Sequence, residues 1–226
     1  MNDKPNIIFI VVDALRPDRL GCYGSGRNLT PSIDKFASES VVLEDAYCCI
    51  NCTDSSLTSI FSGLFPVSHG LVNHGKRVKK SDIQELDKRG VKFLPEILKK
   101  EGYYTAALDW LGRWHTRGYD YYSGPFPNKE RKEAFMNTSF ASRKLAYYYE
   151  KKIDRGDILT QKAIDIIEEK KDNPLFLFIH YWDTHSPYTP PLNCYREKDK
   201  FLSGVFHLVF SPKKIKEVIK YMPKAI

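Results

Sequence analysis

The chain has 226 residues and a mass of 26.2 kDa, and 42% of its residues are hydrophobic, which excludes general disorder. Its 35 Lys and Arg against 28 Asp and Glu give a net charge of +7, which suits an acidic ligand or nucleic acid equally well. The basic residues lie in short scattered pairs without a basic arm or an aromatic-and-basic motif, which argues against nucleic-acid binding.

The N-terminal half predicts alternating strands and helices. The unbroken apolar run at 6–12 is typical of a strand that is buried on both faces of a parallel sheet. A Thr-Pro pair at 30–31 predicts a helix start, and 41–46 predicts a second short strand. Apolar residues then recur at helical spacing over 53–63, where a Gly ends the predicted helix.

The next part of the chain is more polar. Residues 67–90 predict an exposed excursion, 93–100 an amphipathic helix and 104–108 a strand. Residues 111–156 are rich in Tyr, Arg, Lys and Ser without a sustained period, which predicts long loops over the sheet and a helix at 140–151.

A helix at 157–171, ended by Asn-Pro, and a strand at 175–181 complete the alternation, with a further helix predicted at 212–221 in the tail 192–226. We therefore expect a single α/β domain over 1–226, with a mainly parallel sheet sandwiched by helices.

Membrane insertion and secretion are both disfavoured by the sequence. A spanning helix needs about 20 apolar residues, whereas the apolar runs at 7–12 and 175–179 have six and five. The N-terminus has one Lys before the first run and no small-residue cleavage site, which argues against a secretory signal. Five cysteines, an odd number, argue against a disulfide framework. We expect a cytoplasmic protein.

Polar residues follow several of the predicted strands. Asp13 follows the first strand, 110–115 follows the strand at 104–108, and Asp183 and His185 follow the last strand. Ligands bind beyond the carboxyl ends of parallel strands, so these groups are expected to converge at one edge of the sheet.

The stretch V-D-A-L-R-P-D-R-L-G-C-Y-G at 12–24 resembles the opening motif of the sulfatase family, within the alkaline phosphatase superfamily. In that family the Asp at the strand end binds a metal, which implies this role for Asp13. Many sulfatases have two adjacent acids here, whereas this chain has Asp13-Ala14, so one ligand is missing.

The stretch C-T-D-S-S-L-T-S-I-F-S-G-L-F-P at 52–66 resembles the family's nucleophile helix. Counting back ten residues from Gly63, as in the family, gives Thr53 as the nucleophile, and Cys52 lies one residue too early. The Cys-x-Pro-Ser-Arg string, in which sulfatases oxidise the Cys to formylglycine, is absent. Thr here is similar to the superfamily's phosphodiesterases and phosphotransferases. From the residues alone, Thr53 could instead be a simple helix N-cap.

Two later segments extend the resemblance. L-G-R-W-H at 111–115 is similar to the family's Gly-Lys-Trp-His, whose Lys and His contact the ester and the nucleophile, which implies Arg113 and His115. The segment 176–188 resembles the strand that leads to Asp-x-His-x-Pro-Tyr, whose His contacts the sulfate or phosphate, which implies His185. We interpret His180, inside that strand, as a packed residue.

The resemblance implies a metal-dependent hydrolase or transferase of small anionic sulfate or phosphate esters. A divalent ion (Ca, Mg, Mn or Zn) bound by Asp13 and Thr53 would activate Thr53 to attack sulfur or phosphorus in line, while Arg113, His115 and His185 neutralise the ester oxygens. Formylglycine hydrate can expel sulfate by re-forming its aldehyde, and a threonine ester cannot. Thr53 therefore favours phosphate or phosphonate esters.

The second half of the family's metal site is missing. No Asp-His or Asp-Asn pair occurs after Asp183, and members of the family are usually much longer, so the chain corresponds to the N-terminal portion of a sulfatase domain. A complementing C-terminal chain would restore the enzyme. The alternative is a catalytically inactive or incomplete sulfatase-like subunit or binding protein.

Overall fold

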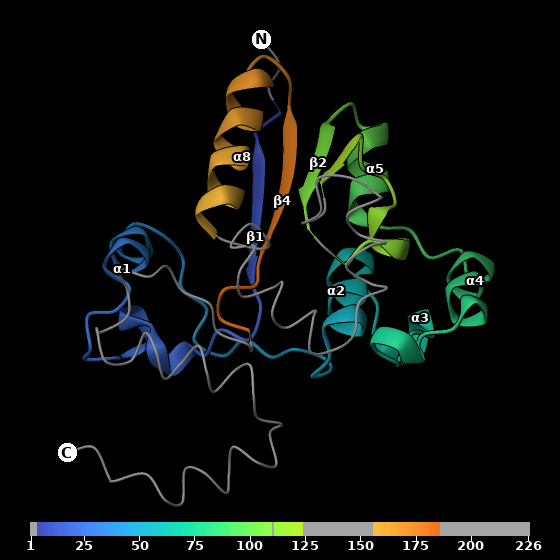
Figure 1. The fold of residues 1–226 in the computed structure, drawn as a ribbon, viewed down its shortest axis with the longest axis horizontal. Coiled ribbons are helices and arrows are strands. Elements are labelled where there is room, and N and C mark those ends of the chain that lie inside the picture. The colour runs from blue at the N-terminus through green and yellow to red at the C-terminus, as the bar shows by residue number, and fades with distance from the viewer. Residues whose placement is uncertain (1–3, 110, 124–155, 186–226) are drawn as a thin grey trace, which may run out of the picture.

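A parallel sheet forms the centre of the molecule. The computed structural model describes residues 4–109, 111–123 and 156–185. Its four strands are β1 (Ile7–Val12), β2 (Tyr104–Leu108), β3 (Tyr121–Ser123) and β4 (Leu175–Tyr181). They lie in the order β1-β4-β2-β3, and every pair is parallel (Figure 1). The predicted parallel α/β sheet is therefore confirmed.

Helices cover both faces of this sheet. Successive residues of β4 point to opposite sides of the sheet, and those on each side pack against a helix. On one face, Phe176 and Phe178 pack with α2 (Thr53–Ser62) in a core that includes Leu57 and Phe61. On the other face, Leu175, Leu177 and Ile179 pack against α8 (Gly156–Glu169). Burial on both faces explains why β4 is apolar at consecutive positions rather than at alternate ones.

The remaining helical segments surround these layers. The longer ones are α1 (Pro31–Ser38), α4 (Lys80–Lys88) and α5 (Leu94–Lys100), and the shorter ones are α3 (Pro66–His69) and the turns Pro17–Arg19, Gly21–Tyr23, Gly75–Arg77 and Arg113–Thr116. Gly63 ends α2 in a left-handed conformation with φ of 68°, as the sequence predicts. None of the described helices has the length and apolarity that a membrane crossing requires.

Several predicted segments differ from the structure. The run at 6–12 forms β1, but the prediction that it is buried on both faces is wrong, because β1 lies at the end of the described strand order and Ile8 and Ile10 are 41% and 55% exposed. The strand predicted at 41–46 is wrong, because these residues pair with none of the described strands, and Val41 and Leu43 are 88% and 67% exposed. The exposed excursion predicted at 67–90 is also wrong in part. This stretch forms α4, and it buries Leu71 and Leu86 completely in the core.

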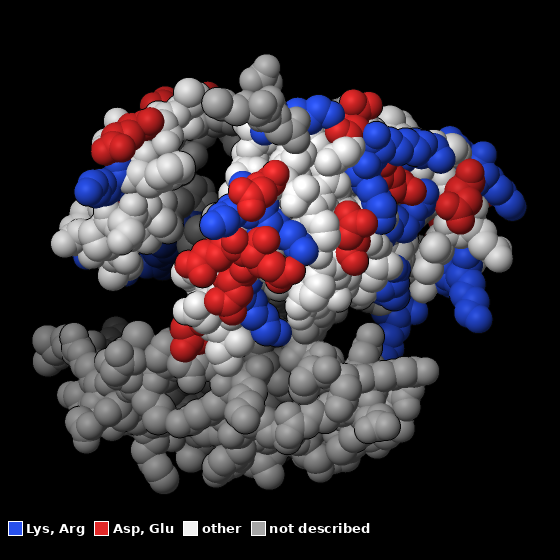
Figure 2. Space-filling model, turned by 90° about the horizontal axis from the view of Figure 1, so that it is seen from above, with Lys and Arg blue, Asp and Glu red and all other residues white. Residues whose placement is uncertain are grey.

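The loop region predicted at 111–156 contains β3, whose three residues pair with β2. The helices predicted at 140–151 and 212–221 lie outside the described residues. Acidic and basic side chains of the described part are interspersed over the face that Figure 2 shows.

Candidate functional site

The carboxyl ends of three neighbouring strands place polar residues side by side. β4 lies between β1 and β2, and its register pairs His180 with Val11 and Ile179 with Leu108. Asp13 follows β1 directly, and Asp109 follows β2 directly. The sheet therefore brings residues that are far apart in the sequence to one edge, where parallel α/β proteins bind their ligands.

Asp13 and Thr53 are joined by a hydrogen bond at this edge. The Thr53 hydroxyl donates to Oδ2 of Asp13 over 3.2 Å. Thr53 is the first residue of α2, and the N-cap position is occupied by Cys52, whose side chain makes no capping hydrogen bond. The alternative in which Thr53 serves as the N-cap is therefore wrong, since its hydroxyl points to the strand end.

The backbone around Asp13 is fixed from both sides. Its N–H donates to the Tyr181 carbonyl over 2.8 Å, and its carbonyl accepts a 2.6 Å hydrogen bond from the Thr184 hydroxyl. The next residue, Ala14, has φ of 58°, a left-handed conformation that costs a residue with a Cβ about 1 kcal/mol or more. These contacts hold the Asp13 carboxylate towards α2.

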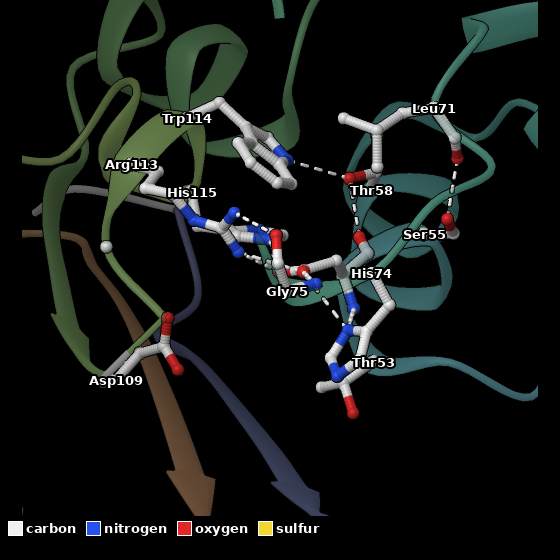
Figure 3. Close-up of polar contacts among 12 residues, drawn as sticks. Thr53, Ser55, Thr58, Leu71, His74, Gly75, Asp109, Arg113, Trp114 and His115 are labelled. Atoms are coloured by element: carbon white, nitrogen blue, oxygen red, sulfur yellow. Dashed lines mark hydrogen bonds and ion pairs between the residues drawn. The ribbon is translucent and has the colours of Figure 1, made fainter. Parts of the chain in front are cut away.

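Asp54, directly after Thr53, contacts two of the three residues that were expected to contact the ester, Arg113 and His115. Its buried carboxylate accepts hydrogen bonds from the Arg113 Nη2 group at 2.8 Å and from the Gly75 N–H at 2.6 Å. His115 Nε2 lies 3.4 Å from Oδ1, and His74 Nδ1 lies 3.1 Å from Oδ2. Figure 3 shows this cluster beside Thr53. Arg113 and His115 thus meet at Asp54.

The cluster keeps Asp54 ionised. Burial disfavours its charge, but the contacts from His115, Gly75 and Arg113 outweigh burial and lower the pKa of Asp54 to about 2. At neutral pH the buried Asp54 carboxylate therefore forms an ion pair with the Arg113 guanidinium, and the Arg113 side chain is 36% exposed.

The loop that carries Arg113 is anchored to α2. The indole N–H of Trp114 donates to the Thr58 hydroxyl over 2.9 Å, and the Arg113 guanidinium lies 4.3 Å from the centre of the Trp114 ring. Arg113 itself has φ of 54° and follows Gly112, which has φ of 62°. Left-handed conformations at functional sites persist where surrounding contacts enforce them, as they do here.

The geometry and the motifs agree with the result of a family comparison, in which the sulfatase family model matches residues 5–203. The chain belongs to the sulfatase family. An N-acetylglucosamine-6-O-sulfatase of Bacteroides thetaiotaomicron is 25% identical over 195 residues, which cover 83% of this chain and 32% of that protein. An arylsulfatase of Clostridium perfringens is 27% identical over 228 residues, which cover 87% and 47%.

Solved structures agree on the fold. The PsFucS1 sulfatase from Pseudoalteromonas sp. matches with a TM-score of 0.63 at 20% identity, over 96% of this chain and 52% of that one. An alkaline phosphatase superfamily protein from Vibrio parahaemolyticus matches with a TM-score of 0.56 at 18% identity, over 96% and 52%. The sulfatase-family chain spans only a third to a half of the relatives named here, and the expected match to an N-terminal portion is confirmed.

His185 and Asp183, after β4, have neighbours of their own in this sulfatase-family chain. The His185 ring lies 5.0 Å from the Trp182 ring, and the backbone N–H of His185 donates to the Trp182 carbonyl over 2.8 Å. Asp183 accepts a 2.9 Å hydrogen bond from the N–H of Gly156, at the start of α8. Asp183 thus stabilises a helix N-terminus, a favourable place for a carboxylate.

A metal would find an incomplete set of ligands at Asp13. In the described part of the chain, no three His, Cys, Asp or Glu residues are grouped for metal binding. Oδ2 of Asp13 and the Thr53 hydroxyl are two oxygen donors, and the buried Nε2 atom of His180, 3.9 Å from Oδ2, has no hydrogen bond among the described residues. Two oxygens and one nitrogen fit an open three-ligand site for a transition metal, and they fall short of the six or more oxygens that Ca²⁺ takes.

Asp54, Asp109 and His180 are the site residues that the sequence analysis missed. His180 is buried as predicted, but it also faces the site. The sequence did contain a signal for Asp109, because this acid directly follows a predicted strand, as Asp13 does. Asp54 carried no signal beyond its place next to Thr53.

Proposed function

We propose that this chain carries the nucleophile portion of a metal-dependent hydrolase or transferase of small anionic esters, with Thr53 attacking sulfur or phosphorus. The observation that supports the proposal is the 3.2 Å hydrogen bond from the Thr53 hydroxyl to Asp13 at the start of α2. A hydroxyl nucleophile needs an adjacent acceptor that can take its proton, and Asp13 is placed for that task.

The N-terminus of α2 and the Arg113 guanidinium would both stabilise the negative charge of the ester. The first N–H groups of α2 lie at the positive end of the helix dipole. Asp54 would act as a positioning residue, because it holds Arg113 and His115 close to Thr53. In the proposed reaction the Thr53 oxygen bonds to sulfur or phosphorus, the bond to the leaving oxygen breaks, and the hydroxyl proton passes to Asp13 or, where the Asp13 carboxylate binds the metal ion, to water.

A divalent ion at Asp13 and Thr53 would lower the pKa of the hydroxyl and polarise the ester. It would bind through oxygen atoms that already lie 3.2 Å apart. This cofactor is part of the proposal, as is the cytoplasmic location expected from the cysteine content.

Sulfate esters and phosphate esters are both candidate substrates, and the relatives and Thr53 favour different ones. The relatives named above are sulfatases, which favours a sulfate ester. Thr53 favours phosphate or phosphonate, because a threonine sulfate has no internal route to release sulfate. We therefore propose testing 4-nitrophenyl sulfate, 4-nitrophenyl phosphate and a phosphonate monoester side by side, with Mn²⁺ or Zn²⁺ added.

The deciding variant is Thr53→Ala, which is expected to abolish release of nitrophenol, while Thr53→Ser retains part of the rate. Thr160→Ala on α8 is the matched control and is expected to keep the wild-type rate. Equal rates in the wild type and Thr53→Ala, or no turnover of any of the three esters, would refute the proposed function.

A further inference from the structure

A buried carboxylate and imidazole pair extends from β2 and β4 towards Asp13. His180 is 1% exposed and Asp109 is 3% exposed. Nδ1 of His180 lies 2.7 Å from Oδ1 of Asp109, and the other oxygen of Asp109 accepts a hydrogen bond from the Tyr122 hydroxyl. The two oxygens of Asp109 are therefore occupied, and the carboxylate fixes the orientation of the His180 ring.

The tautomer of His180 follows from this contact. A carboxylate only accepts hydrogen bonds, so Nδ1 must carry the hydrogen between them. The indole N–H of Trp182 lies 3.2 Å from Nδ1, a contact that needs a lone pair on that atom, so the shorter 2.7 Å contact with Asp109 decides where the hydrogen lies. In a neutral ring, this leaves a lone pair on Nε2.

That lone pair faces another acceptor. Nε2 is buried, has no hydrogen bond among the described residues, and lies 3.9 Å from Oδ2 of Asp13. A buried acceptor and a partly exposed one that face each other repel unless a cation lies between them. A proton alone would not satisfy both atoms, because 3.9 Å exceeds the length of a hydrogen bond, about 2.7 to 3.2 Å.

The two known separations lie on either side of the spacing between two ligands of a metal ion. Two ligands that each lie about 2.1 Å from a tetrahedral ion are about 3.4 Å apart. The separations at the site are 3.9 Å between Nε2 and Oδ2, and 3.2 Å between Oδ2 and the Thr53 hydroxyl. Histidines that bind metals almost always donate their other N–H to a carboxylate or carbonyl, which is the arrangement of His180 and Asp109.

We propose that His180 binds the divalent ion through Nε2, together with Asp13 and Thr53, and that Asp109 is the positioning residue that orients it. The inference rests on the proposed metal-dependent function and specifies the metal. One imidazole and two oxygens favour Zn²⁺ or Mn²⁺ over Ca²⁺, which prefers shells made of oxygen alone.

The test is a metal titration of the 226-residue chain after treatment with EDTA, by isothermal calorimetry with ZnCl₂ and MnCl₂. We expect one ion per chain. The variants His180→Gln and His180→Ala should weaken Zn²⁺ binding on the order of 100-fold or more, and Asp109→Asn by about 10- to 100-fold. Zinc X-ray absorption of the wild type should show an imidazole ligand that His180→Gln loses, which gives a readout independent of turnover.

His69→Gln is the matched control. His69 is also fully buried, but its nitrogens are bound to the Ser59 hydroxyl at 3.0 Å and the Leu71 N–H at 3.1 Å, away from Asp13. It should bind Zn²⁺ like the wild type. Circular dichroism melting identifies the variants that fold. If both His180 variants unfold, the Asp109→Asn variant and the zinc absorption spectrum of the wild type test whether His180 is a metal ligand.

The outcomes separate this inference from the proposed function. Wild-type affinity in folded His180→Gln, with loss in Asp13→Asn, would overturn the assignment of His180 and leave the Thr53 chemistry intact. No saturable binding by the wild type would also overturn it. Normal Zn²⁺ binding through His180 without ester turnover would support the inference and refute the proposed function.

Discussion

Asp54→Asn probes the cluster that orders the site. The change removes the negative charge but keeps an oxygen that can accept the Gly75 N–H hydrogen bond. It leaves Arg113, His115 and His74 beside a neutral amide in a buried position. Breaking a buried ion pair by removing one partner costs about 3 to 5 kcal/mol, and the partial exposure of Arg113 lets water compensate some of this cost.

The pKa of Asp54 gives a second estimate of the magnitude. Folding lowers the pKa from 3.8 to about 2, and each unit is about 1.4 kcal/mol, so the charged form stabilises the fold by about 2 kcal/mol at neutral pH. We expect Asp54→Asn to lower the free energy of unfolding by about 2 to 4 kcal/mol.

The contribution of Asp54 to the free energy of unfolding decreases as the pH falls. A carboxylate with a lowered pKa in the folded state stabilises the protein above its unfolded pKa, 3.8, and this contribution is lost as the pH falls through about 2. The difference between wild type and Asp54→Asn should therefore be full at neutral pH and reduced to roughly half at about pH 3.

The assay is urea denaturation followed by circular dichroism at both pH values. Asp18→Asn is the matched control, because Asp18 pairs with Arg16 at 2.8 Å on the exposed surface, where ion pairs contribute little. It should unfold like the wild type. A free energy of unfolding for Asp54→Asn within error of the wild type, or a difference that does not change with pH, would refute this account of the cluster.

Two further substitutions and one mass measurement test separate predictions. Gly118→Ala should destabilise the fold by several kcal/mol in urea denaturation, because its Cβ would lie 2.3 Å from the Glu96 backbone nitrogen at φ of 82°; wild-type stability would contradict this packing. Trp114→Phe removes the hydrogen bond to Thr58 and should cost about 1 to 2 kcal/mol in the same assay, and no loss would mean that the bond contributes nothing. Mass spectrometry should find Cys52 unmodified, since Thr53 is the proposed nucleophile; a formylglycine mass at Cys52 would contradict the alignment.

The sequence predicted those elements whose signal is local. β1, β2 and β4 are apolar runs bounded by polar residues, and α2 and α8 repeat apolar residues at helical spacing. The strand predicted at 41–46 failed because strand propensity becomes a strand only where a neighbour pairs with it. α4 was missed because charged residues surround the few apolar positions, such as Leu86, that reach the core.

Family resemblance pointed to Asp13 and Thr53, and their separation in the structure is that of a hydrogen bond. It did not indicate that Arg113 and His115 would be held by Asp54. An Asp in the first turn of a helix is common because it favours the helix dipole, so Asp54 carried no sign of a buried ion pair. Only the approach of a loop from 59 residues away gives it that role.

His180 shows most clearly where local patterns stop being informative. A histidine in the apolar strand L-F-L-F-I-H-Y is typical of a packed residue, and the structure does bury it. Its chemistry depends on facts that no pattern within β4 contains. The sheet order places β4 between β1 and β2, and the register sets His180 level with the residues that follow these strands, so Asp109 binds one ring nitrogen and Asp13 faces the other. A register shifted by one residue would turn the ring to the opposite face of the sheet. The environment that favours a metal at His180 is thus a property of strand pairing, and the calorimetric comparison of His180→Gln with His69→Gln tests that pairing as well as the ligand.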